Sequence, residues 1–365
     1  MSDCRVALDV TVAKLGRAGP HVYITELAGA LEQLMGDRLR PIASRLAQLV
    51  PSQRRIGDLA RTLGRDLWWH QMGVTRAARR VGAAVLHLPA GVGPMRRTMP
   101  TVLTIYDLNV LRFPRLFRPW FRYYTRVILP RAARSADAII TLSQGAKADI
   151  VEELGIAAER ITVVPPGVHP LFSPLAPGSE RAAEVRRRYG LAAAFVLTVG
   201  SVEPRKNLPR LFAAVEQLRR RPGTGDVALV HAGPEGWLSN GISGTNGVRF
   251  LGHVPREDLA ALYSLARLCA YPSLYEGFGL PVAEAMACGC PVVTSHVSSL
   301  PEVAADAAVL VDPESIEAIA AGIAALWTDE ARRGHLARKG QERARSFTWE
   351  RAARETAAVY AAVAP

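Results

Sequence analysis

The chain has 365 residues, 49% of them hydrophobic and 21% charged, a composition that excludes a disordered or collagen-like protein and allows a large core. At about 150 residues per domain, this length predicts two domains. The formal net charge is +12, and residues 1–172 carry nearly all of it, with 24 Lys and Arg against 13 Asp and Glu. This asymmetry favours an anionic partner for the first half of the chain: nucleic acid, a membrane surface or a phosphorylated substrate.

Cysteine content indicates a reducing compartment, and hydropathy predicts no signal peptide and no membrane-spanning helix. Four cysteines in so long a chain do not form a disulfide framework, so we expect a cytoplasmic protein. Cys288 and Cys290 have no second Cys or His pair at ligand spacing, which predicts buried thiols rather than a metal site. The N-terminus lacks the pattern of a signal peptide, and no run of about 18 apolar residues predicts a membrane-spanning helix.

Short β-branched runs alternate with longer helical patterns, as in parallel βαβ units. In chain order the predicted strands are Arg5–Val10, Ala83–Leu88, Val102–Tyr106, Ala138–Leu142 and Ile161–Val164, then Phe195–Val199, Val227–His231, Val248–Leu251, Leu268–Tyr271, Pro291–Thr294 and Ala308–Val311. A stretch rich in Pro and Gly, 165–178, separates the two sets. The pattern therefore predicts an α/β protein with two doubly wound parallel sheets, one over 1–174 and one over 175–347. The remaining segment, 348–365, opens a helix at Trp349 that we expect to pack on the first domain.

The first strand-to-helix junction with unusual residues is 16–23, which contains Gly19 and His21. As a glycine-containing turn before a helix, it fits a tight connection and an anion-binding loop equally well. Neither GxGxxG nor a P-loop occurs in the chain, which disfavours nicotinamide and P-loop nucleotide chemistry. No Asp-x-Asp pair is present to hold a metal-bound diphosphate, so basic side chains and backbone amides would have to neutralise one.

The second junction follows the strand that ends at Val199. Arg205 and Lys206 stand directly before a predicted helix that begins near Asn207, whose side chain we expect to cap it. A helix N-terminus repels cations, so this arrangement predicts an anion between them, such as a diphosphate. A solvated basic pair is the alternative.

The third junction, 271–289, carries two carboxylates eight residues apart. Glu276 lies in the predicted loop and Glu284 in the first turn of the following helix, so both are expected to face one cleft. Gly277 and Gly279 allow backbone amides to approach a ligand closely. Two carboxylates with two glycines favour binding of the hydroxyls of a polyol such as ribose or a hexose.

These residues resemble glycosyltransferase family 4, whose GT-B architecture has two Rossmann-like domains facing a cleft. The most specific likeness is Glu-Gly-Phe-Gly-Leu-Pro-x-x-Glu-Ala-Met-Ala-x-Gly, which begins at Glu276 and contains Glu284. The resemblance implies transfer of a sugar from a nucleotide donor, with retention at the anomeric carbon, no metal and no cofactor. By this likeness Glu276 contacts the donor sugar, Glu284 the ribose, and Arg205 with Lys206 the diphosphate, with Arg205, Lys206 and Glu276 as the catalytic set.

The likeness also implies further contacts. The remaining donor-binding residues would be Gly19, Gly200, Ser201, Gly252, His253, Val254, Phe278, Gly279 and Leu280, and the residues that contact donor or acceptor would be Tyr106, Asp107 and His21. Three positions depart from the family pattern. Ser201 replaces an arginine whose role falls to Arg205, Tyr106 replaces a histidine, and the loop around Gly19 lacks a second glycine and an arginine. The Glu-Pro-Arg-Lys-Asn sequence resembles a subgroup rich in mannosyltransferases.

The expected function is transfer of a hexose, mannose from GDP-mannose first and UDP-linked hexoses second, to a glycan or lipid-linked acceptor in polysaccharide biosynthesis. A nucleotide-sugar epimerase or hydrolase and a basic nucleic-acid or membrane-binding protein are the alternatives; no zinc finger, RNP pattern or helix-turn-helix supports nucleic acid as a partner. Two basic and aromatic segments, 54–80 and 112–134, fit either an interfacial helix on anionic lipid or core-packed helices with extended arginines. The first reading places the protein at the inner face of the cell membrane.

Overall fold

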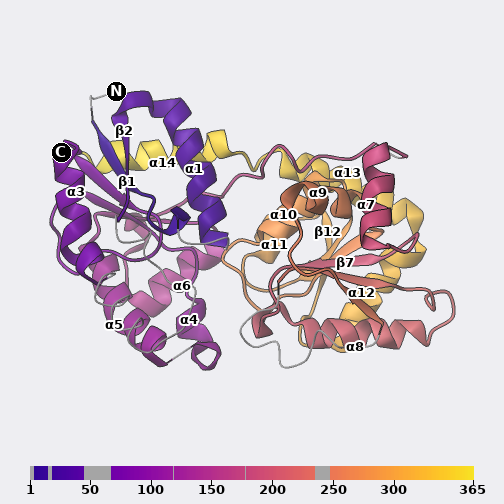
Figure 1. The fold of residues 1–365 in the computed structure, drawn as a ribbon. Coiled ribbons are helices and arrows are strands. Elements are labelled where there is room, and N and C mark those ends of the chain that lie inside the picture. The colour runs from indigo at the N-terminus through magenta and orange to yellow at the C-terminus, as the bar shows by residue number, and fades with distance from the viewer. Residues whose placement is uncertain (1–3, 15–18, 45–66, 118, 177, 235–246) are drawn as a thin grey trace, which may run out of the picture. The chain divides into compact units, whose positions relative to one another are not determined.

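The computed structural model describes residues 4–14, 19–44, 67–117, 119–176, 178–234 and 247–365. They form two compact units, Met1–Gly167 with Trp349–Pro365, and Val168–Thr348 (Figure 1). The chain divides earlier than residue 174 because the end of the Pro- and Gly-rich stretch bonds to the second unit. The Val168 amide donates to the Phe347 carbonyl oxygen at 3.0 Å, and the Leu175 amide to Ser264 Oγ at 3.1 Å.

The first unit contains a six-stranded parallel sheet in the order β2-β1-β3-β4-β5-β6. Its strands are β1 (Val6–Asp9), β2 (Leu39–Ile42), β3 (Val85–Leu88), β4 (Thr101–Thr104), β5 (Ala138–Thr141) and β6 (Ile161–Val163). Its helices are α1 (Gly19–Met35), α3 (Val74–Arg80), α4 (Asn109–Arg112), α5 (Pro119–Ser135), α6 (Gln144–Leu154) and α14 (Trp349–Val363), with a π-helical turn at Trp69–Gly73. Leu86, Leu103 and Ile139 of the central strands are fully buried in its core.

Strand β2 is the one element of this sheet that the sequence did not predict. Its sequence, Leu-Arg-Pro-Ile, lacks a β-branched run and contains Pro41. Proline donates no ladder hydrogen bond and is tolerated in edge strands. Because β2 pairs only with β1 and forms the edge of the sheet, Pro41 fits opposite Leu8.

The second unit contains a second six-stranded parallel sheet, in the order β12-β11-β10-β7-β8-β9. Its strands are β7 (Val196–Val199), β8 (Leu229–Ala232), β9 (Val248–Phe250), β10 (Leu268–Tyr271), β11 (Val292–Ser295) and β12 (Ala308–Val311). Its helices are α7 (Glu180–Tyr189), α8 (Leu208–Arg219), α9 (Arg256–Leu265), α10 (Leu280–Ala287), α11 (Leu300–Ala304), α12 (Ile316–Thr328) and α13 (Glu330–Ala344). Every predicted strand exists with ends within two residues of the expected ones.

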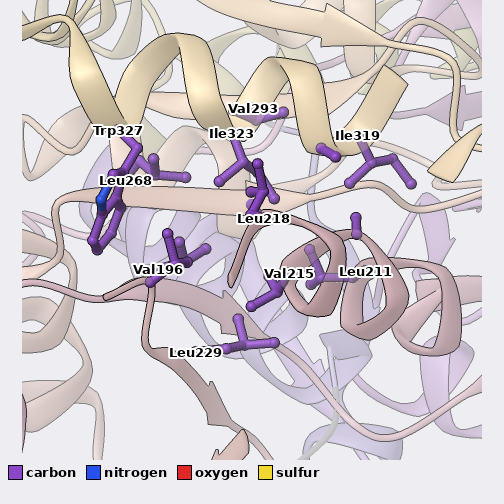
Figure 2. Close-up of a cluster of buried hydrophobic side chains, with 14 of the residues drawn as sticks. Val196, Leu211, Val215, Leu218, Leu229, Leu268, Val293, Ile319, Ile323 and Trp327 are labelled. Carbon is purple, nitrogen blue, oxygen red and sulfur yellow. The ribbon is translucent and has the colours of Figure 1, made fainter. Parts of the chain in front are cut away.

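The core of the second unit joins α8, α12 and the sheet (Figure 2). Figure 2 shows Ile319, Ile323 and Trp327 of α12 on the side that faces Leu218 of α8 and the strands. The α8 side chains in this core repeat at the three- and four-residue spacing of one helix face. This packing fixes the start of α8, and with it the loop that carries Arg205 and Lys206.

Helix α14 belongs to the first unit, although it follows the second unit in sequence. It packs against α1 and strands β4 and β5 (Figure 1). Tyr360 of α14 contacts the buried His87 of β3, whose Nδ1 lies 2.6 Å from the tyrosine hydroxyl. Within the described ranges, no helix combines the length and apolar character needed to cross a membrane.

Candidate functional site

The second unit has a topological switch point between β7 and β10. From β7 the chain continues to β8 on one side, whereas β10 lies on the other side of β7. Ligands of open α/β sheets bind at such points, at the carboxyl ends of the strands. The loop 200–207 follows β7 and the loop 272–279 follows β10, so the two junctions singled out in the sequence flank one crevice of the sheet.

A buried ion-pair network joins these two loops. Glu276 accepts hydrogen bonds from Lys206 Nζ at 2.7 Å and from Arg205 Nη1 at 2.6 Å. Tyr271, the last residue of β10, donates its hydroxyl to Glu276 at 2.8 Å and also accepts from Lys206. The side chains of Lys206 and Glu276 are each 9% exposed, so both charges are nearly removed from water.

Electrostatics keep the Glu276 carboxyl group ionised. Burial by itself would raise the pKa of Glu276, but the charges of Lys206 and Arg205 outweigh burial and lower that pKa to about 2. Burial lowers the pKa of Lys206, and the charge of Glu276 opposes that shift. The Glu276 carboxylate is therefore ionised at neutral pH, where it lies between Lys206 and Arg205.

Carboxylates of the protein itself lie beside Arg205 and Lys206, and Glu276 is the first of them. Glu203 adds a second one, accepting from Arg205 Nε at 2.9 Å and from the Ser201 hydroxyl at 2.6 Å. The alternative of a solvated basic pair is wrong, since both cations are ion-paired and Lys206 is buried. Sequence reasoning missed Glu203 and Tyr271, although both stand in the two junctions.

Asn207 does not cap α8, contrary to the prediction. Its backbone is left-handed, with φ of 59°, and its side chain makes no cap hydrogen bond. The side-chain amide nitrogen Nδ2 of Asn207 instead donates to the carbonyl oxygens of Pro272 at 3.0 Å and Pro313 at 2.6 Å. Asn207 therefore ties the loop after β7 to the loop after β10 and to the segment that follows β12.

Two serines after β11 hold the Glu276 backbone. Ser298 accepts from the Glu276 amide at 3.1 Å, and its hydroxyl donates to the Glu276 carbonyl oxygen at 2.6 Å. Ser299 donates to the same oxygen at 2.9 Å and to that of Phe278 at 2.7 Å. Sequence reasoning missed this pair. The signal was a further strand-to-helix junction, between β11 and α11, with serines just before the Leu-Pro-Glu that opens α11.

Glu284 occupies a different environment from Glu276. It lies in the second turn of α10, not the first, and accepts from the Tyr263 hydroxyl at 3.3 Å. Burial raises the pKa of Glu284 to about 7, with the nearby charge of Arg256 opposing the shift. The two carboxylates thus have separate hydrogen-bond partners and opposite pKa shifts.

Helix α10 begins at the same crevice with a glycine in a conformation that other residues rarely adopt. Gly279 has φ of 107°, and a Cβ there would lie 2.6 Å from Leu300 Cδ2. The N-terminus of α10, which starts at Leu280, presents a partial positive charge. The buried Phe278 packs edge-on against Phe347, with ring centroids 5.2 Å apart.

The loops after β7, β8 and β9 meet closely. The Gly233 amide donates to the Gly252 carbonyl oxygen at 2.9 Å. A Cβ at Gly233 would lie 1.9 Å from the Gly200 carbonyl oxygen, so only glycine fits there. His253 and Val254, which the family likeness implied as donor-binding residues, follow Gly252; Val254 is buried and His253 is exposed. Sequence reasoning missed Gly233, which carries the usual signal of a glycine directly after a strand.

The four predicted residues of the first unit lie at strand-to-helix junctions of its own sheet. Gly19 is the first residue of α1, and His21 bonds to the Ala13 carbonyl oxygen. The Tyr106 hydroxyl donates to the Pro89 carbonyl oxygen, and burial raises the pKa of Tyr106. Asp107 accepts from the Asn109 amide at 2.9 Å at the start of α4.

Metal ligands and disulfides do not contribute to this site in the described part of the chain. There, no group of three or more His, Cys, Asp or Glu side chains is arranged to hold a metal ion. Cys288 and Cys290 are buried free thiols, as predicted, and Cys269 is a third.

The two basic, aromatic segments are partly described. Residues 54–66 of the first lie outside the described residues. In its described part, Trp68 is 47% and Met72 45% exposed, and in the second segment Tyr123 of α5 is 71% exposed. Large apolar side chains therefore reach solvent in both segments.

Two family models match the chain, one for each unit. Residues 185–343 match the model described as glycosyl transferases group 1, and residues 18–170 match the model described as Glycosyltransferase Family 4. The first covers the Arg205, Lys206 and Glu276 network. The second covers most of the first sheet.

Curated relatives and solved structures agree with these models. O-antigen chain mannosyltransferase B from Escherichia coli is 35% identical over 268 residues, which are 71% of this chain and 69% of that protein. Serotype-specific mannosyltransferase WbdA from Escherichia coli is 32% identical over 223 residues, 59% of this chain and 27% of that protein. The structures of sucrose-phosphate synthase from Thermosynechococcus elongatus and of Anabaena HepE in complex with UDP and glucose match with TM-scores of 0.75 and 0.71, at 23% and 18% identity. The former match covers 99% of both chains, the latter 98% of this chain and 100% of HepE.

Proposed function

This chain belongs to the family 4 glycosyltransferases, and from that premise we propose that it transfers a hexose, mannose first, from a nucleotide sugar to a glycan or lipid-linked acceptor. The observation that carries the proposal is the buried network of Arg205, Lys206 and Glu276 at the switch point of the second sheet. It offers two cations and a helix N-terminus for a diphosphate, next to a carboxylate for sugar hydroxyls.

In the proposed complex, Arg205, Lys206 and the amides of Gly279 and Leu280 bind the diphosphate, whose negative charge grows as it leaves. Stabilising charge that develops in the transition state is a large source of catalysis. The bond between the anomeric carbon and the phosphate oxygen breaks, and a bond to the acceptor oxygen forms on the same face. The leaving phosphate oxygen takes the proton of the acceptor hydroxyl, so no metal or cofactor is required. Glu276 orients the hexose.

The proposed ribose contact is Glu284, whose carboxylate accepts hydrogen bonds from vicinal hydroxyls. The remaining donor contacts are proposed at Gly200, Ser201, Gly252, His253, Val254 and Phe278 of the second unit. In the first unit, Gly19, His21, Tyr106 and Asp107 are proposed to contact donor or acceptor.

Donor turnover in Lys206→Ala and Glu276→Ala tests these roles. Both variants should turn over the sugar donor at least about a hundredfold more slowly. Loss of a cation that stabilises the transition state typically costs that much, and so does misplacing a substrate by about 1 Å. Lys339→Ala and Glu216→Ala are the matched controls, because these side chains, on α13 and α8, are 38% and 53% exposed. Near wild-type turnover in both site variants would refute the assignment.

The donor is proposed to be GDP-mannose, with UDP-linked hexoses second. This proposal draws on the Glu-Pro-Arg-Lys-Asn sequence and on the two mannosyltransferase relatives. The structural neighbour with UDP supports a nucleotide partner of some kind. Thermal-shift measurements with GDP-, UDP- and dTDP-sugars test it, because a ligand that binds only the folded state raises its apparent stability. If another nucleotide sugar raised the Tm and GDP-mannose did not, that sugar would replace GDP-mannose as the proposed donor.

Epimerase or hydrolase activity on the nucleotide sugar is the competing proposal. Incubating the donor without acceptor separates the reactions by product, since an epimerase gives a new nucleotide sugar and a hydrolase gives free hexose. A transferase gives little of either. Activity that survives treatment with EDTA would support metal-independent transfer.

A peripheral location at an anionic membrane surface, through 54–80 and 112–134, completes the proposal, with no role for nucleic acid. Its support is the exposure of Trp68, Met72 and Tyr123 beside arginines. Co-sedimentation with liposomes that does not depend on anionic lipid would contradict it.

A further inference from the structure

A hollow lined by arginines lies on the first unit, at the amino ends of the strands. Its volume is about 560 Å³, and its lining residues are Met95, Arg96, Arg97, Arg131, Arg134 and Ser135. Arg96 and Arg97 precede β4, and Arg131 and Arg134 end α5, just before β5. Because β4 and β5 are parallel neighbours, the hollow lies at the amino ends of these strands. Tyr106 and Asp107, which follow β4, lie at the opposite, carboxyl ends.

Hydrogen bonds fix the walls of the hollow. The Ser135 hydroxyl donates to the Pro94 carbonyl oxygen at 2.6 Å and joins the end of α5 to the loop before β4. Asp137 accepts from Arg97 Nε at 2.8 Å and from the Thr101 amide at 2.9 Å. These hydrogen bonds hold together the two segments that line the hollow.

The positive charge of the hollow is largely uncompensated. Asp137 pairs with Arg97, but Arg96, Arg131 and Arg134 have no carboxylate within 4.0 Å among the described residues. Arg131 and Arg134 bond instead to the neutral carbonyl oxygens of Val127 and Leu154. Three net positive charges thus face one concave surface.

The end of helix α5 does not account for these cations. A helix C-terminus carries about half a negative charge. Arg160, which lies outside the hollow, already bonds to the carbonyl oxygens of Ala133 and Arg134, at 3.3 and 3.2 Å. The three arginines of the hollow therefore exceed the charge that the helix end can balance.

We propose that this hollow is a second anion site, separate from the sugar-donor site, that binds a phosphate-class oxyanion through Arg96, Arg131 and Arg134. Planar guanidinium groups form charge-assisted, often bidentate hydrogen bonds to phosphate oxygens. The oxyanion belongs either to a soluble phosphate ester or to a phospholipid headgroup, which present the same chemistry. The inference goes beyond the transferase proposal and does not depend on it.

Site-resolved arginine modification tests this inference. The full-length protein is treated with phenylglyoxal, with and without inorganic pyrophosphate, and modified arginines are mapped by mass spectrometry of peptides. At a pyrophosphate concentration about ten times its Kd, modification of Arg96, Arg131 and Arg134 should slow about tenfold. The exposed Arg126, on the same helix α5, should react at an unchanged rate.

Two matched double variants check the site. Arg131→Gln with Arg134→Gln should abolish the protection of Arg96, whereas Arg122→Gln with Arg126→Gln should preserve it. Both double variants remove the same charge from the same helix. Because Arg96 itself is read out, pyrophosphate bound at Arg205 and Lys206 does not affect the result.

A vesicle arm separates the two sources of the oxyanion. Protection by pyrophosphate supports a soluble phosphate ester. Protection only by vesicles of phosphatidylglycerol with phosphatidylcholine, and not by phosphatidylcholine alone, supports a headgroup. Absence of protection by either, equal protection of Arg126 by pyrophosphate, or protected Arg96 in the Arg131 and Arg134 double variant would overturn the proposal.

Discussion

One carboxylate, Glu276, pairs with both cations at the crevice between β7 and β10, and a second, Glu203, pairs with Arg205. Lys206 and Arg205 come from the loop after β7, and Glu276 comes from the loop after β10. Burying such charges is costly unless each one is paired. The network therefore stays compact without a bound phosphate, and an incoming diphosphate meets a carboxylate among the cations.

Glu276→Gln should bind nucleoside diphosphate more tightly while turning over the donor more slowly. The substitution removes the negative charge that competes with phosphate for Lys206 and Arg205, so the Kd should fall about tenfold, or about 1.4 kcal/mol. Isothermal titration with GDP and UDP measures the Kd. Glu203→Gln is the comparison: it removes a carboxylate from Arg205 alone and leaves the pair of Lys206 and Glu276 in place, so its Kd should fall less. Weaker nucleotide binding in Glu276→Gln would contradict the idea.

Glu284 should make stability depend on pH between its unfolded and folded pKa values. Its folded pKa of about 7 lies above the usual value of 4.5. Between these values the folded state binds more protons than the unfolded state, so stability falls as pH rises. Glu284→Gln cannot ionise, so it removes this loss of folding stability at high pH. The variant should therefore have a higher Tm than the wild type at pH 8, and the difference should shrink at pH 5. An equal Tm difference at both pH values would show that ionisation of Glu284 is not the cause.

At the scale of single residues, the sequence identified the charged groups of the site but not their pairing. Arg205, Lys206 and Glu276 were singled out by residue type and by position at strand-to-helix junctions. Their mutual contacts depend on the order β7-β10 in the sheet, which places loops 70 residues apart side by side. The same reason explains why Asn207, predicted as a cap, bonds across to Pro272 and Pro313 instead.

At the scale of elements, the loops at the carboxyl ends of β7 and β8 pack without room for a side chain. Gly233→Ala should destabilise the protein by about 1–3 kcal/mol, the usual cost of overpacking, and should weaken nucleotide binding by displacing Gly200. The reason is backbone contact, since the added Cβ would lie 1.9 Å from the Gly200 carbonyl oxygen.

Urea unfolding of Gly233→Ala and Gly225→Ala checks this prediction. A Cβ at Gly225 would make only ordinary contact, 3.6 Å from the Arg219 carbonyl oxygen. We expect its effect to stay within about 0.5 kcal/mol of zero. Equal stability of both variants would show that the loop after β7 moves aside without cost.

Strand β2 shows where local patterns stop predicting elements. Its Pro41 and the polar Arg40 carry no strand signal, and its pairing with β1 forms it. The eleven predicted strands are buried, β-branched segments for the most part, and in those segments periodicity and burial indicate the same structure.

At the scale of the whole molecule, the chain returns to its first unit at the end. Removal of 349–365 should destabilise the first unit, because α14 covers α1 and supplies Tyr360 to the buried His87. Hydrogen exchange should therefore speed up in α1 and remain unchanged in α8. The control is removal of Ala364 and Pro365, which lie beyond the helix. Faster exchange in α8 to the same degree would contradict this assignment.

The charge asymmetry of the chain also belongs to this scale. Nearly all of the excess positive charge lies in residues 1–172. Arg205 and Lys206, in the crevice between β7 and β10, lie in the second half and are paired with carboxylates. The excess charge therefore concerns the first unit. There the structure places four of its arginines around one hollow at the amino ends of β4 and β5.

The sequence by itself determined the α/β class, the two parallel sheets, the family and the charged residues of the two loops at the switch point of the second sheet. These follow from periodicity, turn residues and short motifs, which are properties of neighbouring residues. Tertiary structure decided the strand order, the pairing of Glu276 with Lys206 and Arg205, the opposite pKa shifts of Glu276 and Glu284, and the arginine hollow. Each of these depends on distances between segments far apart in the chain and on burial, and local sequence patterns fix neither.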